Sequence, residues 1–90
     1  MKITANGNHT LESFKAGVNA GYVIYSSGSL GAATAALTYK DEGGAYVPIT
    51  DGAIVIGEQM KVDSGANMEL FVTVTGADGS TSINITSKSF

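Results

Sequence analysis

The stretch NMELFVTVTG, residues 67–76, has the clearest strand pattern in this chain and sets its fold class. Two sets of side chains alternate along it: Met68, Leu70, Val72 and Val74 on one face, and Glu69, Phe71, Thr73 and Thr75 on the other. Alternation with period two is typical of a strand with one buried face, and β-branched residues favour strands. We therefore predict a strand whose aliphatic face lies in a core.

The stretch STSINITSK, residues 80–88, repeats this pattern, with Ile83 and Ile85 on the inward face. Between the two strands lie Gly, Ala, Asp and Gly at positions 76–79, which are turn-forming residues. The spacing predicts that the two strands form a C-terminal hairpin.

Further strands are expected upstream, around residues 10–15 and 22–26. The segment SLGAATAALTYK, residues 29–40, is rich in alanine, which favours a helix. Gly28 and Gly31 at its start, and the alternation of polar and apolar residues over 34–40, favour a strand instead. The segment AIVIGEQMKVD, residues 53–63, contains an unbroken apolar run followed by alternation, with Gly57 as a candidate bulge or break.

About seven to eight short strands, with turn signals about every 10 residues, predict an all-β fold: an antiparallel β-sandwich or a small barrel. The 90 residues are enough for one core only, so we expect a single domain over 1–90. Residues 1–9 are polar and form a candidate mobile N-terminal arm.

The stretch ALTYKDEGGAYVPIT, residues 36–50, contains an acidic, glycine-rich knot between two alternating runs. We interpret it as a hairpin in which Asp41 and Glu42 are solvated turn residues. Tyr39 and Tyr46 flank the turn and are expected to pair across it. Pro48 cannot donate a ladder hydrogen bond, which predicts an edge strand or a bulge after the turn.

Charge is scarce: 14% of the residues are charged, and the net charge is −3. A negative chain with five scattered lysines is a poor match for nucleic acid, which requires clustered cations. The chain shows no signal peptide and no long apolar run, so we expect synthesis in the cytoplasm and no membrane partner.

Catalytic groups are few. His9 is the one histidine, and there is no cysteine, so nucleophilic triads lack a well-placed base. Asp51, Asp63 and Asp78 each lie within two residues of a glycine, as turn aspartates do. The knot at 41–44 offers too few oxygens for calcium. We expect no enzyme activity, no cofactor and no metal site.

Six residues are candidates for contact with a neighbouring molecule. The run 54–56 is apolar on both faces, and Phe71 lies on the otherwise polar face of the strand at 67–76. Together with the two tyrosines beside the turn, the interface candidates are Phe71, Ile54, Val55, Ile56, Tyr39 and Tyr46.

The stretches LTYKDEGGAYVPI, residues 37–49, and ELFVTVTGADGSTSINIT, residues 69–86, resemble small all-β structural proteins of tailed bacteriophages. The resemblance implies a virion component: a capsid decoration, or cement, protein on the outer surface of the capsid. It further implies the major capsid protein and copies of the chain itself, most often three, as partners. Low charge and a surface of Ser, Thr and Gly agree with a place in a lattice.

A second hypothesis stays open. Tyr22, Tyr25, Tyr39 and Tyr46 each offer an apolar face and a polar tip, which suits stacking on sugars. The chain would then be a carbohydrate-binding or adhesin-like recognition module.

Overall fold

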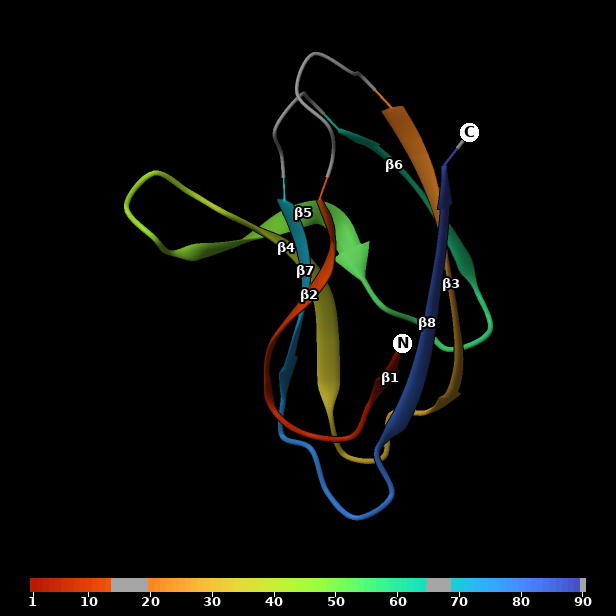
Figure 1. The fold of residues 1–90 in the computed structure, drawn as a ribbon. Coiled ribbons are helices and arrows are strands. Elements are labelled where there is room, and N and C mark those ends of the chain that lie inside the picture. Colours follow the sequence, from red (N-terminus) through yellow and green to blue (C-terminus); the bar gives the residue numbers. More distant parts are fainter. Residues whose placement is uncertain (14–19, 65–68, 90) are drawn as a thin grey trace.

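The computed structural model describes residues 1–13, 20–64 and 69–89, and the side chains of residues 1–11, 23–62 and 69–87. Within this part of the chain all regular structure is β-strand. The strands are β1 (Lys2–Ile3), β2 (Gly7–Ser13), β3 (Ala20–Ser29), β4 (Thr34–Lys40), β5 (Tyr46–Ala53), β6 (Gln59–Ser64), β7 (Glu69–Thr75) and β8 (Ser82–Ser89). They form two four-stranded antiparallel sheets that pack face to face as a β-sandwich, as predicted (Figure 1).

The strand order is β1-β8-β3-β6 in one sheet and β2-β7-β4-β5 in the other. Successive strands therefore lie in different sheets at every step except from β4 to β5, which form a hairpin. The predicted C-terminal hairpin is wrong, because β7 pairs with β2 and β4 whereas β8 pairs with β1 and β3. Alternation identifies the buried face of each strand, but the same pattern suits a partner in either sheet.

The core lies between the sheets and contains the aliphatic faces that the alternation predicts. Leu70, Val72 and Val74 of β7 face Ile83 and Ile85 of β8 across the sandwich, and all five are buried. Burial of one such side chain contributes roughly 1.5–3 kcal/mol. The inward side chains of these two strands are thus a large part of what holds the sheets together.

The first nine residues belong to the sandwich and do not form a separate arm. Ile3 is a core residue, and β1 pairs with β8 through Lys2 opposite Asn84 and Ile3 opposite Ile83. The Met1 nitrogen donates to the Ile85 carbonyl at 2.8 Å, and the Ile85 N–H donates to the Met1 carbonyl at 2.7 Å. The prediction of a mobile arm relied on the polar composition of this segment and overlooked Ile3, whose burial holds the segment in place.

Two inter-sheet connections at one end of the sandwich are tied together. The carboxylate of Asp78, in the β7–β8 connection, accepts hydrogen bonds from the Ala32 N–H at 3.2 Å and the Ser80 N–H at 2.8 Å. Thr81 is 4% exposed, and its hydroxyl donates to the Leu30 carbonyl at 2.9 Å. Asp78 and Thr81 thus join the turn after β3 to the turn after β7.

Strand β5 is an edge strand, as Pro48 predicts. Pro48 pairs with Thr38, but the next pair is Ala53 with Ala36, so β5 carries extra residues in a bulge over 49–52. Asp51 lies in this bulge with φ 58°, a left-handed conformation that aspartate tolerates better than most residues. The Asp51-Gly52 pair, which is typical of a turn, therefore forms part of a bulge inside strand β5.

The apolar run 54–56 is a connection between the sheets and not part of a strand, which corrects the sequence interpretation of 53–63. Gly57, with φ 87°, is the predicted break. Its N–H donates to the Ser26 carbonyl at 3.0 Å, and the Glu58 N–H donates to the Val55 carbonyl at 3.1 Å. The chain turns here and enters β6.

Candidate functional site

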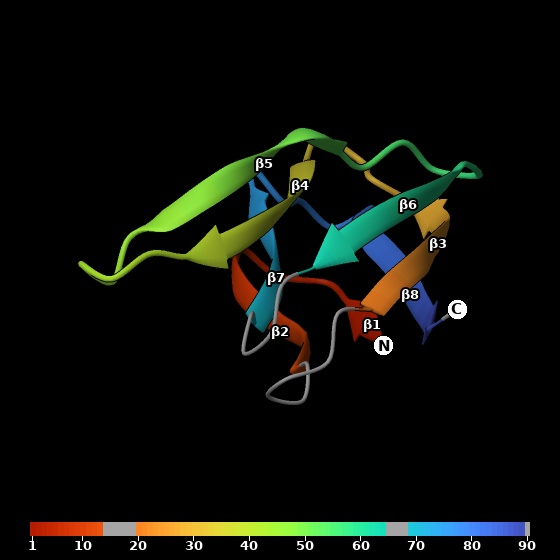
Figure 2. The ribbon, with the colours of Figure 1, turned by 90° about the horizontal axis from the view of Figure 1, so that it is seen from above.

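The β4–β5 hairpin extends past the rest of the sandwich, as the views in Figures 1 and 2 both show. Its turn is closed by Asp41, whose carbonyl accepts from the Gly44 N–H at 3.1 Å and whose N–H donates to the Ala45 carbonyl at 2.9 Å. The Asp41 carboxylate accepts from the Ala45 N–H at 2.8 Å. Gly44 has φ 87°, which a glycine adopts without strain. Asp41 and Glu42 are exposed turn residues, as the sequence predicts.

The predicted pairing of Tyr39 with Tyr46 is wrong. Tyr39 stands opposite Val47, whereas Tyr46 stands opposite Lys40, so the two tyrosines are one position out of register and point to opposite faces of the hairpin. The five-residue turn sets this register. Both tyrosines are half-buried.

Tyr46 packs instead on Phe71 of β7. The two ring centroids are 5.0 Å apart and the planes meet at 86°, an edge-to-face arrangement. The Lys40 ammonium lies 5.6 Å from the Tyr46 centroid, within reach of a cation–π interaction. Phe71 lies on the face opposite Val72, as predicted, but it is only 5% exposed. It cannot offer a neighbour the surface that the sequence suggested.

A chain of side-chain hydrogen bonds runs across the same face of the sheet, from buried Thr38 through half-buried Thr73 to exposed Asn8. Thr73 Oγ1 donates to Asn8 Oδ1 at 2.7 Å, which uses its hydroxyl proton. Thr38 Oγ1 lies 2.8 Å from Thr73 Oγ1 and therefore acts as the donor in that pair. These bonds join β4, β7 and β2 outside the core. The base of the projecting hairpin is consequently stiff.

The three aliphatic candidates at 54–56 have different environments. Ile54 is a core residue, and its N–H donates to the Ala35 carbonyl at 2.8 Å. Ile56 is half-buried against the core. Val55 is 50% exposed, while its carbonyl accepts from the Ser26 hydroxyl at 3.0 Å. Of this run, only the Val55 side chain is well placed to meet another molecule.

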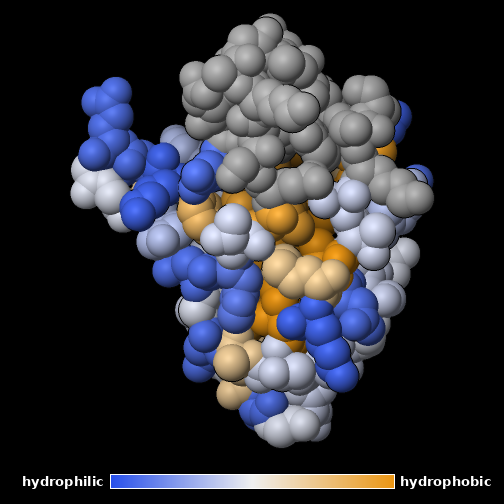
Figure 3. All heavy atoms as spheres, in the orientation of Figure 1, coloured by the Kyte–Doolittle hydropathy of each residue, from blue (hydrophilic) through white to orange (hydrophobic). Residues whose placement is uncertain are grey.

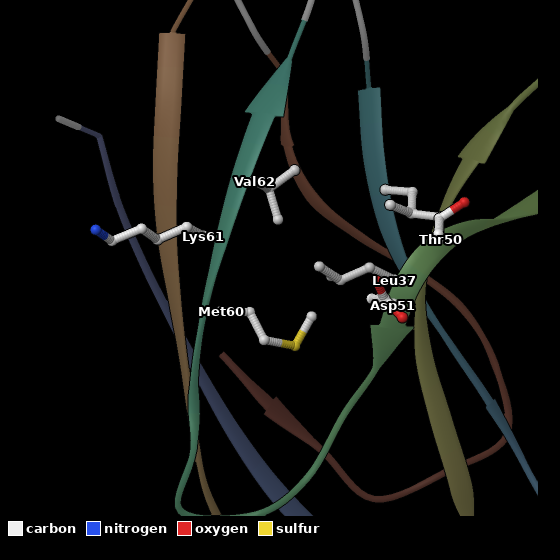
Figure 4. Close-up of a pocket in the computed structure, with 8 residues that line it drawn as sticks. Leu37, Thr50, Asp51, Met60, Lys61 and Val62 are labelled. Carbon is white, nitrogen blue, oxygen red and sulfur yellow. The ribbon is translucent and has the colours of Figure 1, made fainter.

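A cavity of about 320 Å³ opens between β5 and β6, which are edge strands of different sheets (Figure 4). Apolar side chains of Leu37, Met60 and Val62 point into it, and the bulge at Thr50 and Asp51 forms its far wall. Residues of the bulge over 49–52 thus line the cavity on the β5 side. In the sequence, Asp51-Gly52 at the bulge is recognisable only as a turn signal, and nothing indicates a cavity beside it.

Little in the described residues suggests catalysis. His9 lies in β2, and its Nε2 is 2.9 Å from the Ala5 carbonyl. Within the described ranges there is no group of three or more His, Cys, Asp or Glu residues that could hold a metal ion. The Asp41 carboxylate accepts a backbone N–H of its own turn, and the Asp78 carboxylate accepts one N–H of its own turn and the Ala32 N–H of the turn after β3. Those contacts make them structural acceptors.

Among the described residues no helix is long and apolar enough to cross a membrane. Apolar residues reach the surface in the seam between the two sheets on the face drawn in Figure 3, with hydrophilic residues on both sides. Comparison with protein-family models, with curated proteins and with solved structures found no match to this chain.

Proposed function

We propose that this chain is a non-enzymatic structural protein that decorates or cements the outer face of a phage capsid. The observation that carries the proposal is the projecting β4–β5 hairpin, stiffened at its turn by Asp41 and at its base by the contact of Tyr46 with Phe71. A contact element that is ordered before binding loses less conformational entropy when it meets its partner. A rigid arm on a small sandwich suits attachment to a protein surface better than it suits chemistry.

The low charge supports this role. A chain with 14% charged residues has weakly solvated surfaces, which are tolerable when neighbouring subunits cover them. The carboxylates at the turns hydrogen-bond to backbone N–H groups and so stabilise the fold. The resemblance of the sequence to phage structural proteins favours the capsid as the partner.

Co-sedimentation with phage shells that lack decoration tests the proposal. We expect saturable binding to the shells and a higher temperature of shell disruption. Removal of the turn residues Glu42 and Gly43 should weaken binding, while Ser80→Ala, in a different loop, should not. A chain that binds no shell and leaves shell stability unchanged would refute a capsid role.

A recognition module is the second candidate, and one observation favours it. Tyr25 is 43% exposed at the centre of the outer face of the β1-β8-β3-β6 sheet, and it stands opposite Gln59 and Thr86. An exposed ring between hydrogen-bonding side chains suits stacking on a sugar. A glycan that raises the melting temperature of the wild type but not of Tyr25→Ala would support this function. No shift across a broad glycan panel would exclude it.

A further inference from the structure

The outermost strands of the two sheets are β1, β6, β2 and β5. An outermost strand presents backbone N–H and C=O groups that can pair with another chain. Proteins usually limit such pairing with short strands, proline, bulges or charged side chains. The four edges of this sandwich are protected to different degrees.

Three of these edges carry clear protection. β1 has two residues, which is too short to act as a template for pairing. β2 has a register shift between Thr10 and Glu12. β5 contains Pro48 and the bulge over 49–52. Each of these features interrupts the regular row of donors and acceptors.

β6 has no such interruption. It pairs with β3 residue for residue, from Gln59 opposite Tyr25 to Ser64 opposite Ala20, and it contains no proline. In the described part of the chain β3 is its one strand neighbour. Lys61 is exposed on it and is the single obstacle to pairing among its described side chains. Beside it the cavity leaves space that β5 does not fill.

We propose that β6 pairs antiparallel with β6 of a second copy of this chain, about a two-fold axis, so that the two sheets join into one. The charges along β6 indicate that its partner is a second copy of the same strand. A register centred on Lys61 would set two lysines opposite each other, which is unfavourable. A register centred on Val62 sets Lys61 of each copy opposite position 63 of the other, which is an aspartate.

The same register brings the Val62 positions of the two copies together. Val62, which is already buried, and half-buried Met60 line the cavity, so the second copy would lie across its mouth and shield Met60 further from water. A valine pair directly opposite each other is a favourable cross-strand contact. Charge and apolar contact therefore select the same register.

The first test is the mass of the chain in solution, measured by light scattering coupled to size exclusion. We expect a dimer, with twice the 9.2 kDa of one chain. Lys61→Asp or Asp63→Lys sets like charges opposite each other twice in the symmetric dimer. Each should raise the dissociation constant at least about tenfold. The double variant restores opposite charges and should return to within about threefold of the wild type.

Lys40→Asp, on the projecting hairpin, is the matched control and should leave the dimer intact. Melting curves show whether each variant is folded. A wild type that stays monomeric at millimolar concentration would overturn the proposal, and so would a trimer. Single variants that dimerise as well as the wild type would equally exclude β6 as the interface.

A second test reports the register. The chain has no cysteine, so Val62→Cys introduces one thiol. Mild oxidation should join two copies rapidly, whereas Ser80→Cys, in an exposed loop, should join slowly. Equal rates would refute the register centred on Val62. These assays contain no capsid, so they test the pairing separately from the proposed capsid role. A chain that dimerises through β6 but binds no capsid would refute only the capsid role, and a chain that binds capsids as a monomer would refute only the pairing.

Discussion

The ring of Tyr46 meets the ring of Phe71 edge to face, at a centroid distance of 5.0 Å. The contact joins the only hairpin among the described strands to the central strand β7, and it covers Phe71 on the face away from the core. An aromatic pair contributes roughly 0.5–1.5 kcal/mol beyond the burial of its area. The projecting hairpin is therefore held by side chains as well as by backbone pairing.

Tyr46→Ala should lower the free energy of unfolding by about 1–2 kcal/mol, because Phe71 loses its cover and its aromatic partner. Urea denaturation monitored by circular dichroism measures the change. Tyr46→Phe keeps the ring and should cost much less. Equal losses for the two variants would show that the ring contact contributes little.

Phe71→Asp should destabilise the fold itself. Phe71 is buried, and an unpaired carboxylate in its place would be costly, so we expect a loss of about 3 kcal/mol or more. Thr75→Asp, on the same strand at an exposed position, is the matched control. Normal thermal stability of Phe71→Asp, with association lost, would instead favour the direct interface role that the sequence suggested.

Thr81→Val should cost about 1–2 kcal/mol, because the new side chain has nearly the same volume but cannot donate to the Leu30 carbonyl or accept from the Asp78 N–H. Hydrogen exchange should rise first in the turns at 30–33 and 76–81. Exchange that rises evenly over the whole chain would argue against a local tie between these turns.

Gly31→Ala should be strongly destabilising, by about 2 kcal/mol or more, because two costs combine. Gly31 has φ 60°, and a Cβ there would lie 2.4 Å from the Asp78 carboxylate. Gly57→Ala tests the backbone cost alone, since Gly57 has φ 87° but a Cβ placed there would have no other residue within 4 Å apart from its chain neighbours. Gly79→Ala has neither cost and should be neutral or slightly stabilising. Thermal unfolding should rank the three variants in that order.

The sequence was enough to predict the core-facing side chains of the strongly alternating strands and the approximate number of strands. Leu70, Val72 and Ile83 alternate with polar neighbours, and that period depends only on burial of one face. Pro48 predicted an edge because its nitrogen cannot donate, wherever the strand lies. Such predictions rest on properties of one strand taken alone.

The neighbours of each strand were not predictable in this way. The connection after β7 contains residues typical of a hairpin turn, yet Asp78 uses its carboxylate to bind Ala32, which is distant in sequence. The position of Tyr39 relative to Tyr46 depends on one residue of turn length. The cavity is lined by the bulge of β5 and by residues of β6. Each of these features requires knowledge of two segments together.

The alternation of strands between the two sheets also shapes how the chain reaches its native state. Only β4 and β5 pair with a sequence neighbour, while β8 must insert between β1 and β3 to complete its sheet. Folds dominated by such non-local pairing typically fold in milliseconds to seconds. On the ribosome, the first sheet cannot close until residues 82–89 have emerged, so β1 and β3 would wait, while the intervening strands are made, for the strand that joins them.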